Sequence, residues 1–366
     1  MNNTNIIFAT RSDYLTRRGG DTTQLLMTKK YLDELYNCNV KIITDVNQLS
    51  FFPENSIVHV FNLQTEKLTL EYVLAAKSQN KKVALSTIYW DLLYSYIVET
   101  LFSKTGTIQL AKQFSAIVSF FAPVINKLPG ERYLRREYIA IRKLIIDNSD
   151  VLLPNSDEEL GIIEKEFKYE NLKNKSHIVP NAVVLDHKSP INSAIKRGIL
   201  IVGRVEPNKN QLNLIRALKK SKLSSEPIYV IGRIGDVNYF EMLKKESASL
   251  PHIKYIEELP YEDLIEFYKK CKVHVLPSFR ESPGLVSLEA LYYGCNIVIS
   301  GESYCPVKYY EFSKYGFLCD PNSTNSIKSA MEKAYESSII VPLEYFEKFS
   351  FRNVAVETYN AYEKIR

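Results

Sequence analysis

Short apolar runs alternate with amphipathic helical patterns along almost the whole chain, and this alternation limits the possible folds more than any other feature. Strands that alternate with helices form parallel sheets covered on both faces. The runs predicted to be strands are residues 5–10, 40–44, 56–61, 82–86, 150–154 and 176–180, and then 198–203, 227–232, 252–258, 272–277, 295–300 and 316–320. The sequence therefore predicts an α/β protein built from doubly wound parallel sheets.

The chain of 366 residues is long for one hydrophobic core, and its length favours two domains. The alternation lapses into polar and turn-forming residues at 184–197, which we interpret as a linker. We therefore predict one domain over residues 1–183 and a second over 198–345. The amphipathic helix in 346–366 is expected to pack back on the first domain.

Composition excludes several classes of function. With 47 basic and 42 acidic residues the net charge is only +5, too small to indicate a nucleic-acid partner. The five cysteines are widely spaced and form no CxxC pair, as expected for reduced core residues and not for a metal site. No signal peptide and no run of 18 apolar residues is present, so we expect a cytoplasmic location.

Residues 101–146 differ from the rest of the first half because basic and aromatic residues share their helical stretches. The segment carries eight Lys and Arg residues against Glu131 and Glu137. Two interpretations remain open. The segment can lie on an anionic membrane, such as the inner face of the cell membrane, or grip an anionic acceptor. Alternatively it is a pair of core-packing helices with a solvated basic side.

The stretch 273–300 has the layout of a ligand site: an apolar run, a polar loop with Glu281, and a helical pattern with Glu289. Ser282 and Pro283 are typical of an N-cap and a first helical residue, so we expect the helix to begin there. The amides of Gly284 and Leu285 would then face an anion. Two carboxylates eight residues apart are also common on solvated helices, so other features must decide.

Three further loops follow predicted strands and suit a phosphate or a sugar. Arg204 and Lys209 flank a turn after the run 198–203, where a fork-shaped cation and a point charge match a diphosphate. The loop with Gly232 and Arg233 lacks a GxGxxG fingerprint, although we assign both residues to the donor side. The paired glycines Gly19 and Gly20 permit close backbone approach to a ligand, or form a simple turn.

Together these stretches resemble the retaining glycosyltransferases of the GT-B fold, specifically the family 4 class or glycosyl transferases group 1. GRVEPNKNQLNLIRAL resembles the GR-x(4)-K phosphate motif, and ESPGLVSLE resembles the E-x(7)-E motif. HIVPNAVV resembles the segment that closes the N-terminal domain, and FSFRNVAVETYNAYEKI resembles the final helix. The resemblance implies two Rossmann-like domains facing a cleft, with the acceptor on the N-terminal side and the nucleotide sugar on the other.

The resemblance also implies roles for individual residues. Arg204 and Lys209 would bind the diphosphate of a UDP- or GDP-linked donor and neutralise the leaving group without a metal or other cofactor. Glu281 would contact the donor sugar, and Glu289 would hold the ribose hydroxyls. The remaining donor-side residues by resemblance are Pro283, Gly284, Leu285, Gly19 and Gly20.

The chain departs from the family pattern at two places. PNAVV stands where the family usually has Pro-Asn-Gly-Val-Asp, and Tyr89, Trp90 and Asp91 stand where the family often has a histidine. His59 and His274 lie within strand-like runs and are interpreted as core residues. The partners expected are a nucleotide sugar and a glycan or lipid-linked acceptor for cell-surface polysaccharide or glycoconjugate synthesis. A sugar-nucleotide hydrolase or epimerase, or a silent partner-binding subunit, remains the alternative.

Overall fold

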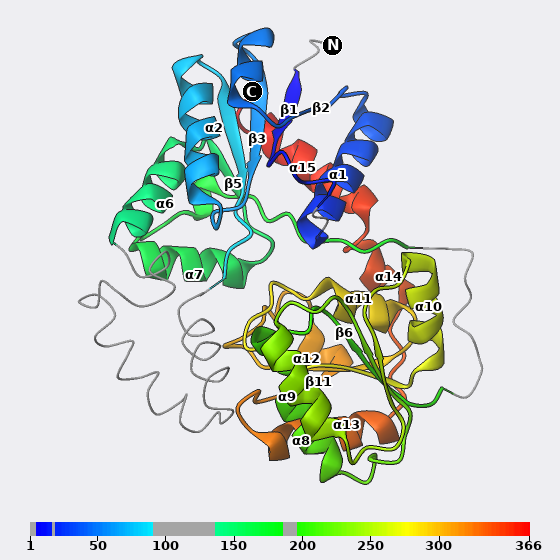
Figure 1. Cartoon of the computed structure of the whole chain (residues 1–366). Coiled ribbons are helices and arrows are strands. Elements are labelled where there is room, and N and C mark those ends of the chain that lie inside the picture. The colour runs from blue at the N-terminus through cyan, green and yellow to red at the C-terminus, as the bar shows by residue number, and fades with distance from the viewer. Residues whose placement is uncertain (1–4, 17–18, 91–135, 186–195) are drawn as a thin grey trace. The chain divides into compact units, whose positions relative to one another are not determined.

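The structure is a computed structural model, which describes residues 5–16, 19–90, 136–185 and 196–366. The described residues fall into two compact units (Figure 1). Described residues up to Trp90, from Arg136 to Val184 and from Glu344 to Arg366 make up the first, and described residues from Leu185 to Leu343 make up the second. No helix among the described residues is long and apolar enough to cross a membrane.

The first unit is built on a five-stranded sheet in the order β2-β1-β3-β4-β5, with every pair parallel. Its strands are β1 (Ile6–Ala9), β2 (Lys41–Ile43), β3 (Ile57–Phe61), β4 (Lys82–Ser86) and β5 (Val151–Leu153). Successive strand residues point to opposite faces, so both faces are apolar and each needs a helical cover. The strand predicted at 176–180 is wrong: Ser176 makes only an isolated bridge to Leu152.

Helices cover both faces of this sheet. One face packs against α1 (Gly20–Tyr36) and α15 (Phe351–Glu363), which also contact each other. The other face packs against α2 (Glu66–Ser78), α6 (Arg136–Asn148) and α7 (Asp157–Phe167). Helix α15 therefore brings the last residues of the chain to the sheet formed by its first half (Figure 1).

The second unit is built on a six-stranded parallel sheet in the order β11-β10-β9-β6-β7-β8. Its strands are β6 (Ile199–Val202), β7 (Ile228–Ile231), β8 (Ile253–Ile256), β9 (Val273–Leu276), β10 (Asn296–Ser300) and β11 (Gly316–Cys319). The chain moves from β6 to β7 on one side and later returns to β9 on the other. The strand order therefore reverses between β6 and β9, where ligands bind in open α/β sheets.

Six of the described helices belong to the second unit, and α14 begins at its boundary with the first. In chain order these helices are α8 (Gln211–Lys219), α9 (Val237–Ser247), α10 (Tyr261–Lys270), α11 (Leu285–Tyr292), α12 (Phe312–Tyr315), α13 (Thr324–Glu336) and α14 (Leu343–Glu347). Helices α8, α9 and α13 pack on the face formed by Ile199, Val273 and Val298. His274 alternates with Val273 and contacts Tyr268 of α10, so α10 lies over the opposite face. The predicted doubly wound architecture is confirmed in both units.

The remaining predictions about the core have mixed outcomes. The five cysteines, all within the described residues, form no disulfide, and four of them are buried. Helix α1 has Gly19 at its N-cap position, and no side chain bonds there. Of the basic segment, residues 101–135 lie outside the described residues, so its membrane contact stays a prediction.

The described end of the basic segment supports the core-packing interpretation. Arg142 is buried and forms an ion pair with the buried Glu66, with 3.8 Å between Nη2 and Oε2. Its Nε also donates to the carbonyl of Leu63. Lys143 donates to the carbonyl of Phe167. These two cations hold helices together and are not available to a membrane.

Candidate active site

The loop after β6 places two predicted donor residues at the switch point of the second sheet. Gly203 has a φ of +147°, and a side chain at this position would contact the aliphatic stem of Lys209. The 3₁₀ turn Pro207–Lys209 then leads into α8, capped by Asn210 in the left-handed conformation. This turn points Lys209 back over the end of β6.

The loop after β9 places Glu281 against Lys209. The two side chains form an ion pair through Nζ and Oε1, and both are largely buried, with 17% and 11% of their surfaces exposed. The Ser278 hydroxyl donates to the same Oε1 at 2.7 Å. A cation and a carboxylate predicted from distant segments of the sequence are thus in direct contact at the reversal between β6 and β9.

The loops after β6 and β9 are also joined through their backbones. The amide of Phe279 donates to the carbonyl of Asn208 at 2.8 Å, and the Asn208 side chain donates to the carbonyl of Arg280. Asn210 donates to the carbonyls of Pro277 and Pro321. These bonds fix the loop that carries Lys209 against the loop that carries Glu281, so the ion pair is held in place from both sides.

Arg204 belongs to the same loop as Lys209 but is not part of the ion pair. Its side chain is 67% exposed and lies 3.5 Å from Glu206 Oε2. An exposed guanidinium beside one carboxylate can exchange that partner for a phosphate at little cost, because exposed ion pairs contribute little to stability. The structure therefore places Arg204 on the rim of the site and Lys209 within it.

Helix α11 begins later than predicted. The sequence indicated a start at Ser282 and Pro283, but the helix starts at Leu285 with Gly284 at the N-cap, and the Ser282–Pro283 peptide is cis. Gly284 has a φ of +81°, and a β-carbon there would lie 3.3 Å from Glu281 Oε2. A larger residue would crowd this carboxylate. Gly284 at the N-cap and Leu285 at the first helical position still carry amides without a partner inside the helix, so their contact with an anion stays a prediction.

Glu289 lies within α11 and is held by tyrosines of α10 that sequence reasoning missed. The Tyr268 hydroxyl donates to Glu289 Oε2 at 2.9 Å, and Tyr261 lies close to the same carboxyl group. Burial raises the pKa of Glu289 to about 7, although the hydrogen bonds to the tyrosines act in the opposite direction. The seven-residue spacing of Tyr261 and Tyr268 on one helical face was the available signal, but their partner is distant in sequence.

Gly232 and Arg233 follow β7, next to the loop after β6. A β-carbon on Gly232 would lie 2.2 Å from the Gly203 carbonyl oxygen, so only glycine allows the two loops to approach this closely. Arg233 is exposed and pairs with Glu258 at 3.6 Å. Beside Gly232 lies a mainly apolar pocket lined by Val205, Val230, Gly232, Ile234, Phe240, Tyr255, Ile256 and Glu257.

The predicted residues of the first unit lie at the start of α1. Gly20 is the first residue of this helix and Gly19 its N-cap. His59 and His274 are buried, and burial lowers the pKa of each to about 3, so the interpretation of both as core residues is confirmed. Tyr89 is buried in the core and does not replace the family's histidine.

Comparisons with known proteins agree with this geometry. The family model described as glycosyl transferases group 1 matches residues 186–349. An uncharacterized 41.2 kDa protein in the cps region of Klebsiella pneumoniae is 24% identical over 69% of this chain and 80% of its own length. The O-antigen chain mannosyltransferase B of Escherichia coli is 27% identical over 45% of each chain, so this chain spans about half of that relative.

A solved structure of a lipopolysaccharide outer core galactosyltransferase, in its apo form, matches 99% of this chain and all of its own, with a TM-score of 0.65 at 12% identity. Two parallel α/β units with this structural likeness define the GT-B fold of glycosyltransferases. The match of residues 186–349 shows that the second half of the chain is similar to glycosyl transferases group 1, as the resemblance of its motifs implied.

Proposed function

We propose that this glycosyltransferase transfers a sugar from a nucleotide-sugar donor, with retention of configuration, to a glycan or lipid-linked acceptor in cell-surface polysaccharide synthesis. The contact between Lys209 and Glu281 at the switch point carries the proposal. The names of two similar proteins, an O-antigen mannosyltransferase and a lipopolysaccharide galactosyltransferase, support the assignment to cell-surface polysaccharides. We also propose that the protein acts on the cytoplasmic side of the cell membrane.

In this proposal the two cations bind the diphosphate and neutralise the charge that develops on the leaving nucleotide. Lys209 contributes a point charge that a phosphate oxygen can share with Glu281, and Arg204 on the rim approaches from its exposed position. The outward amides at the start of α11 add donors to the same anion. Electrostatic stabilisation of this kind can replace a metal ion, because the charges are fixed before the reaction begins.

Glu281 and Glu289 act on different parts of the donor. Glu281 lies beside Gly284 and contacts the sugar, while Glu289 accepts hydrogen bonds from the ribose hydroxyls with Tyr268 holding its other oxygen. The apolar pocket beside Gly232 suits the nucleobase, because its walls are mainly aliphatic and aromatic. Retention fits a site in which the leaving phosphate itself accepts the acceptor's proton.

The test begins with a thermal-shift panel of UDP- and GDP-linked sugars, in which a specific donor raises the unfolding temperature by mass action. Transfer from that donor is then measured with Lys209→Met, Glu281→Gln and the control Lys222→Met. Lys222 pairs with Glu336 on the exposed surface of the same unit. We expect turnover to fall at least about a hundredfold in the first two variants and to stay unchanged in the control.

The reaction products decide between the proposal and its alternatives. Proton NMR of the product should show the anomeric configuration of the donor and no free sugar in excess. Release of sugar at the same rate with and without acceptor would indicate a hydrolase. Full transfer activity in Lys209→Met or Glu281→Gln would reject the site.

A further inference from the structure

The first unit contains a pocket with several polar side chains in its lining, and none of the predicted donor residues lines it. It lies at the carboxyl ends of β3, β4 and β5, on the face of the sheet that α1 and α15 cover. Its lining includes Thr28 of α1, His59 of β3, Ser86 of β4 and Thr358 of α15. Because ligands of parallel sheets bind at the carboxyl ends of the strands, the position itself suits a ligand.

A buried relay of three side chains ends at this pocket. The Tyr362 hydroxyl lies 2.6 Å from His59 Nδ1, and Ser86 Oγ lies 2.8 Å from His59 Nε2. Burial lowers the pKa of His59 to about 3, so the ring is neutral and carries one N–H.

The direction of the hydrogen bonds in this relay follows from Tyr362. Its hydroxyl is buried and has no second partner among the described residues, so its proton must go to His59 Nδ1 or remain unsatisfied, which is costly. His59 Nε2 then carries the N–H and donates to Ser86 Oγ. The Ser86 hydroxyl can then donate its own proton to another acceptor. A ligand in the pocket can provide that acceptor.

Thr28 and Thr358 are two buried threonines that line the pocket from facing helices. Only one of them uses its hydroxyl in a hydrogen bond within the protein. The Thr358 hydroxyl donates to the Val354 carbonyl at 2.7 Å. Thr28 is 6% exposed and has no hydrogen-bond partner among the described residues. Thr28 lines the pocket and its oxygen is not one of the buried atoms that lack a partner, so its hydroxyl is open to the pocket and can bond a ligand there.

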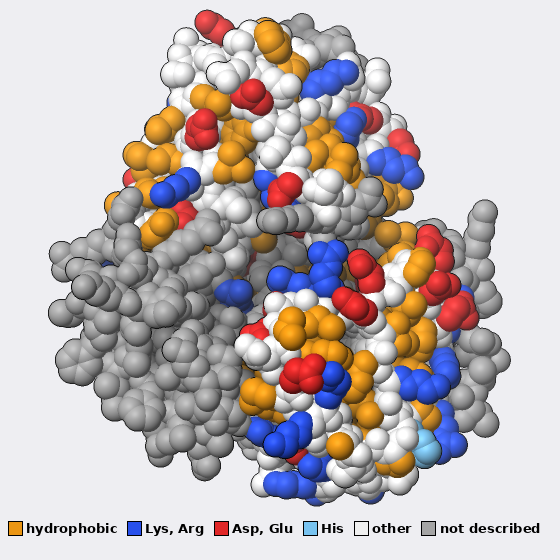
Figure 2. All heavy atoms as spheres, viewed as in Figure 1, with side chains coloured by type: hydrophobic (Ala, Val, Ile, Leu, Met, Phe, Trp, Pro, Cys, Tyr) orange, Lys and Arg blue, Asp and Glu red, His pale blue; other side chains and the backbone are white. Residues whose placement is uncertain are grey.

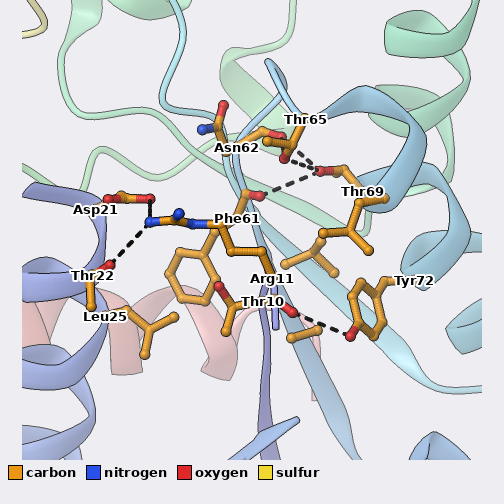
Figure 3. A pocket seen from close by; sticks show the side chains of 13 residues that line it. Thr10, Arg11, Asp21, Thr22, Leu25, Phe61, Asn62, Thr65, Thr69 and Tyr72 are labelled. Atoms are coloured by element: carbon orange, nitrogen blue, oxygen red, sulfur yellow. Dashed lines mark hydrogen bonds and ion pairs between the residues drawn. The ribbon is translucent and has the colours of Figure 1, made fainter. Parts of the chain in front are cut away.

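The charges around the pocket favour a neutral ligand. None of the described residues that line it is Lys or Arg, and Asp21 contributes a carboxylate at its edge. The neighbouring cation, Arg11, lies in the adjoining pocket at the ends of β1 and β3. There it already pairs with Asp13 at 3.3 Å and with Asp21 at 3.4 Å, and Figure 3 shows the pair with Asp21. Among the described residues of the pocket, a phosphate would therefore meet a carboxylate and no positively charged side chain.

We propose that this pocket binds the hydroxyl-bearing edge of a neutral sugar, the glycosyl residue that accepts the transferred sugar, through Ser86, Thr28 and Asp21. The identification of this sugar as the acceptor rests on the proposed function. The pocket and its preference for an uncharged sugar are argued from the residues of the first unit alone. Ser86 donates one hydrogen bond, Thr28 donates or accepts a second, and Asp21 accepts a third. A sugar phosphate is disfavoured.

Saturation-transfer NMR on the whole chain tests the pocket directly. The probes are the methyl α-glycosides of mannose, glucose and galactose, together with mannose 6-phosphate and glucose 6-phosphate. We expect at least one neutral glycoside to bind and each phosphate to bind more weakly than its neutral counterpart. Loss of one hydrogen bond in Thr28→Val or Ser86→Ala should weaken glycoside binding about fivefold.

Thr358→Val is the matched control, because it removes a hydroxyl of the same pocket that is already used by α15. It should leave glycoside affinity within about twofold of the parent chain. The proposal is overturned if no glycoside binds, if a sugar phosphate binds more tightly than its neutral counterpart, or if the Thr28 and Thr358 variants behave alike. Nucleotide binding in the same samples reports on the second unit, so failure of the donor site is recognised separately.

Discussion

The two sheets each have a switch point where the strand order reverses, but the charged groups there are arranged differently. Between β6 and β9 a single lysine pairs with a single glutamate, and Arg204 stays exposed beside them. Between β1 and β3, Arg11 is already paired with the carboxylates of Asp13 and Asp21, and Figure 3 shows the pair with Asp21. The order of the strands therefore determines where a ligand can bind. The side chains of the loops at the strand ends determine whether that site suits an anion or a neutral molecule.

Both signs of charge are present on the face of the molecule that Figure 2 shows. In the view of Figure 2, Lys and Arg side chains are interspersed with Asp and Glu side chains on both units. The net charge of +5 is small for a chain of this size. Local pairing at the strand ends, not the overall field, is what separates the two switch points.

The largest effect on stability is expected where the first unit uses charge inside its core. Arg142→Met leaves the carboxylate of Glu66 buried without its cation, which should reduce the free energy of unfolding by about 3–5 kcal/mol. Denaturant unfolding followed by circular dichroism measures this, with the exposed Lys165→Met in the same unit as control. An equal midpoint for the two variants would mean that the charges of the first unit are not structural.

A smaller effect is expected from the titration of Glu289. Because its pKa is raised to about 7, the carboxyl group is protonated at pH 6 and must lose its proton to accept from both ribose hydroxyls. Nucleotide affinity should fall about tenfold from pH 8 to pH 6, since one proton is released on binding. Calorimetric titration checks this, and Glu289→Gln should bind more weakly at pH 8 with a flatter profile. Identical profiles for the two proteins would place the ribose elsewhere.

The smallest effect concerns the relay in the first unit. Tyr362→Phe removes the donor to His59 Nδ1, so the ring can take either tautomer and Ser86 can donate to His59 instead of the pocket. Glycoside affinity should fall about two- to threefold, less than in Ser86→Ala, because the hydroxyl remains but is no longer directed. A loss as large as that of Ser86→Ala would mean that Tyr362 supports the pocket's shape and not its proton arrangement.

Much of the fold could be predicted from the sequence because buried parallel strands are short, continuous apolar runs. Eleven of the predicted strands are present. The one at 176–180 fails because it runs beside β5 with only scattered bonds, such as His177 N to Leu152 O, and does not extend into a ladder. A single apolar stretch does not show how many of its backbone groups will find partners.

The contact at the proposed donor site was predictable in part for a similar reason. Lys209 and Glu281 follow strands that are neighbours at the reversal, so their contact follows from the strand order once that is known. The predicted start of α11 was wrong, because Gly284, in a left-handed conformation, occupies the N-cap position that we had assigned to Ser282. The relay from Tyr362 to Ser86 joins residues from opposite ends of the chain, and no local pattern indicates such a contact.

The central claim is that the paired cation and carboxylate at the second switch point bind the donor's diphosphate. Calorimetric titration of the nucleoside diphosphate of the preferred donor into the parent chain and Lys209→Met, at low and high salt, tests it most directly. The parent should bind with an affinity that falls as salt is added, and Lys209→Met should bind at least about a hundredfold more weakly. An affinity in Lys209→Met within about twofold of the parent would contradict the account, since one lost charge-assisted bond should cost more than that.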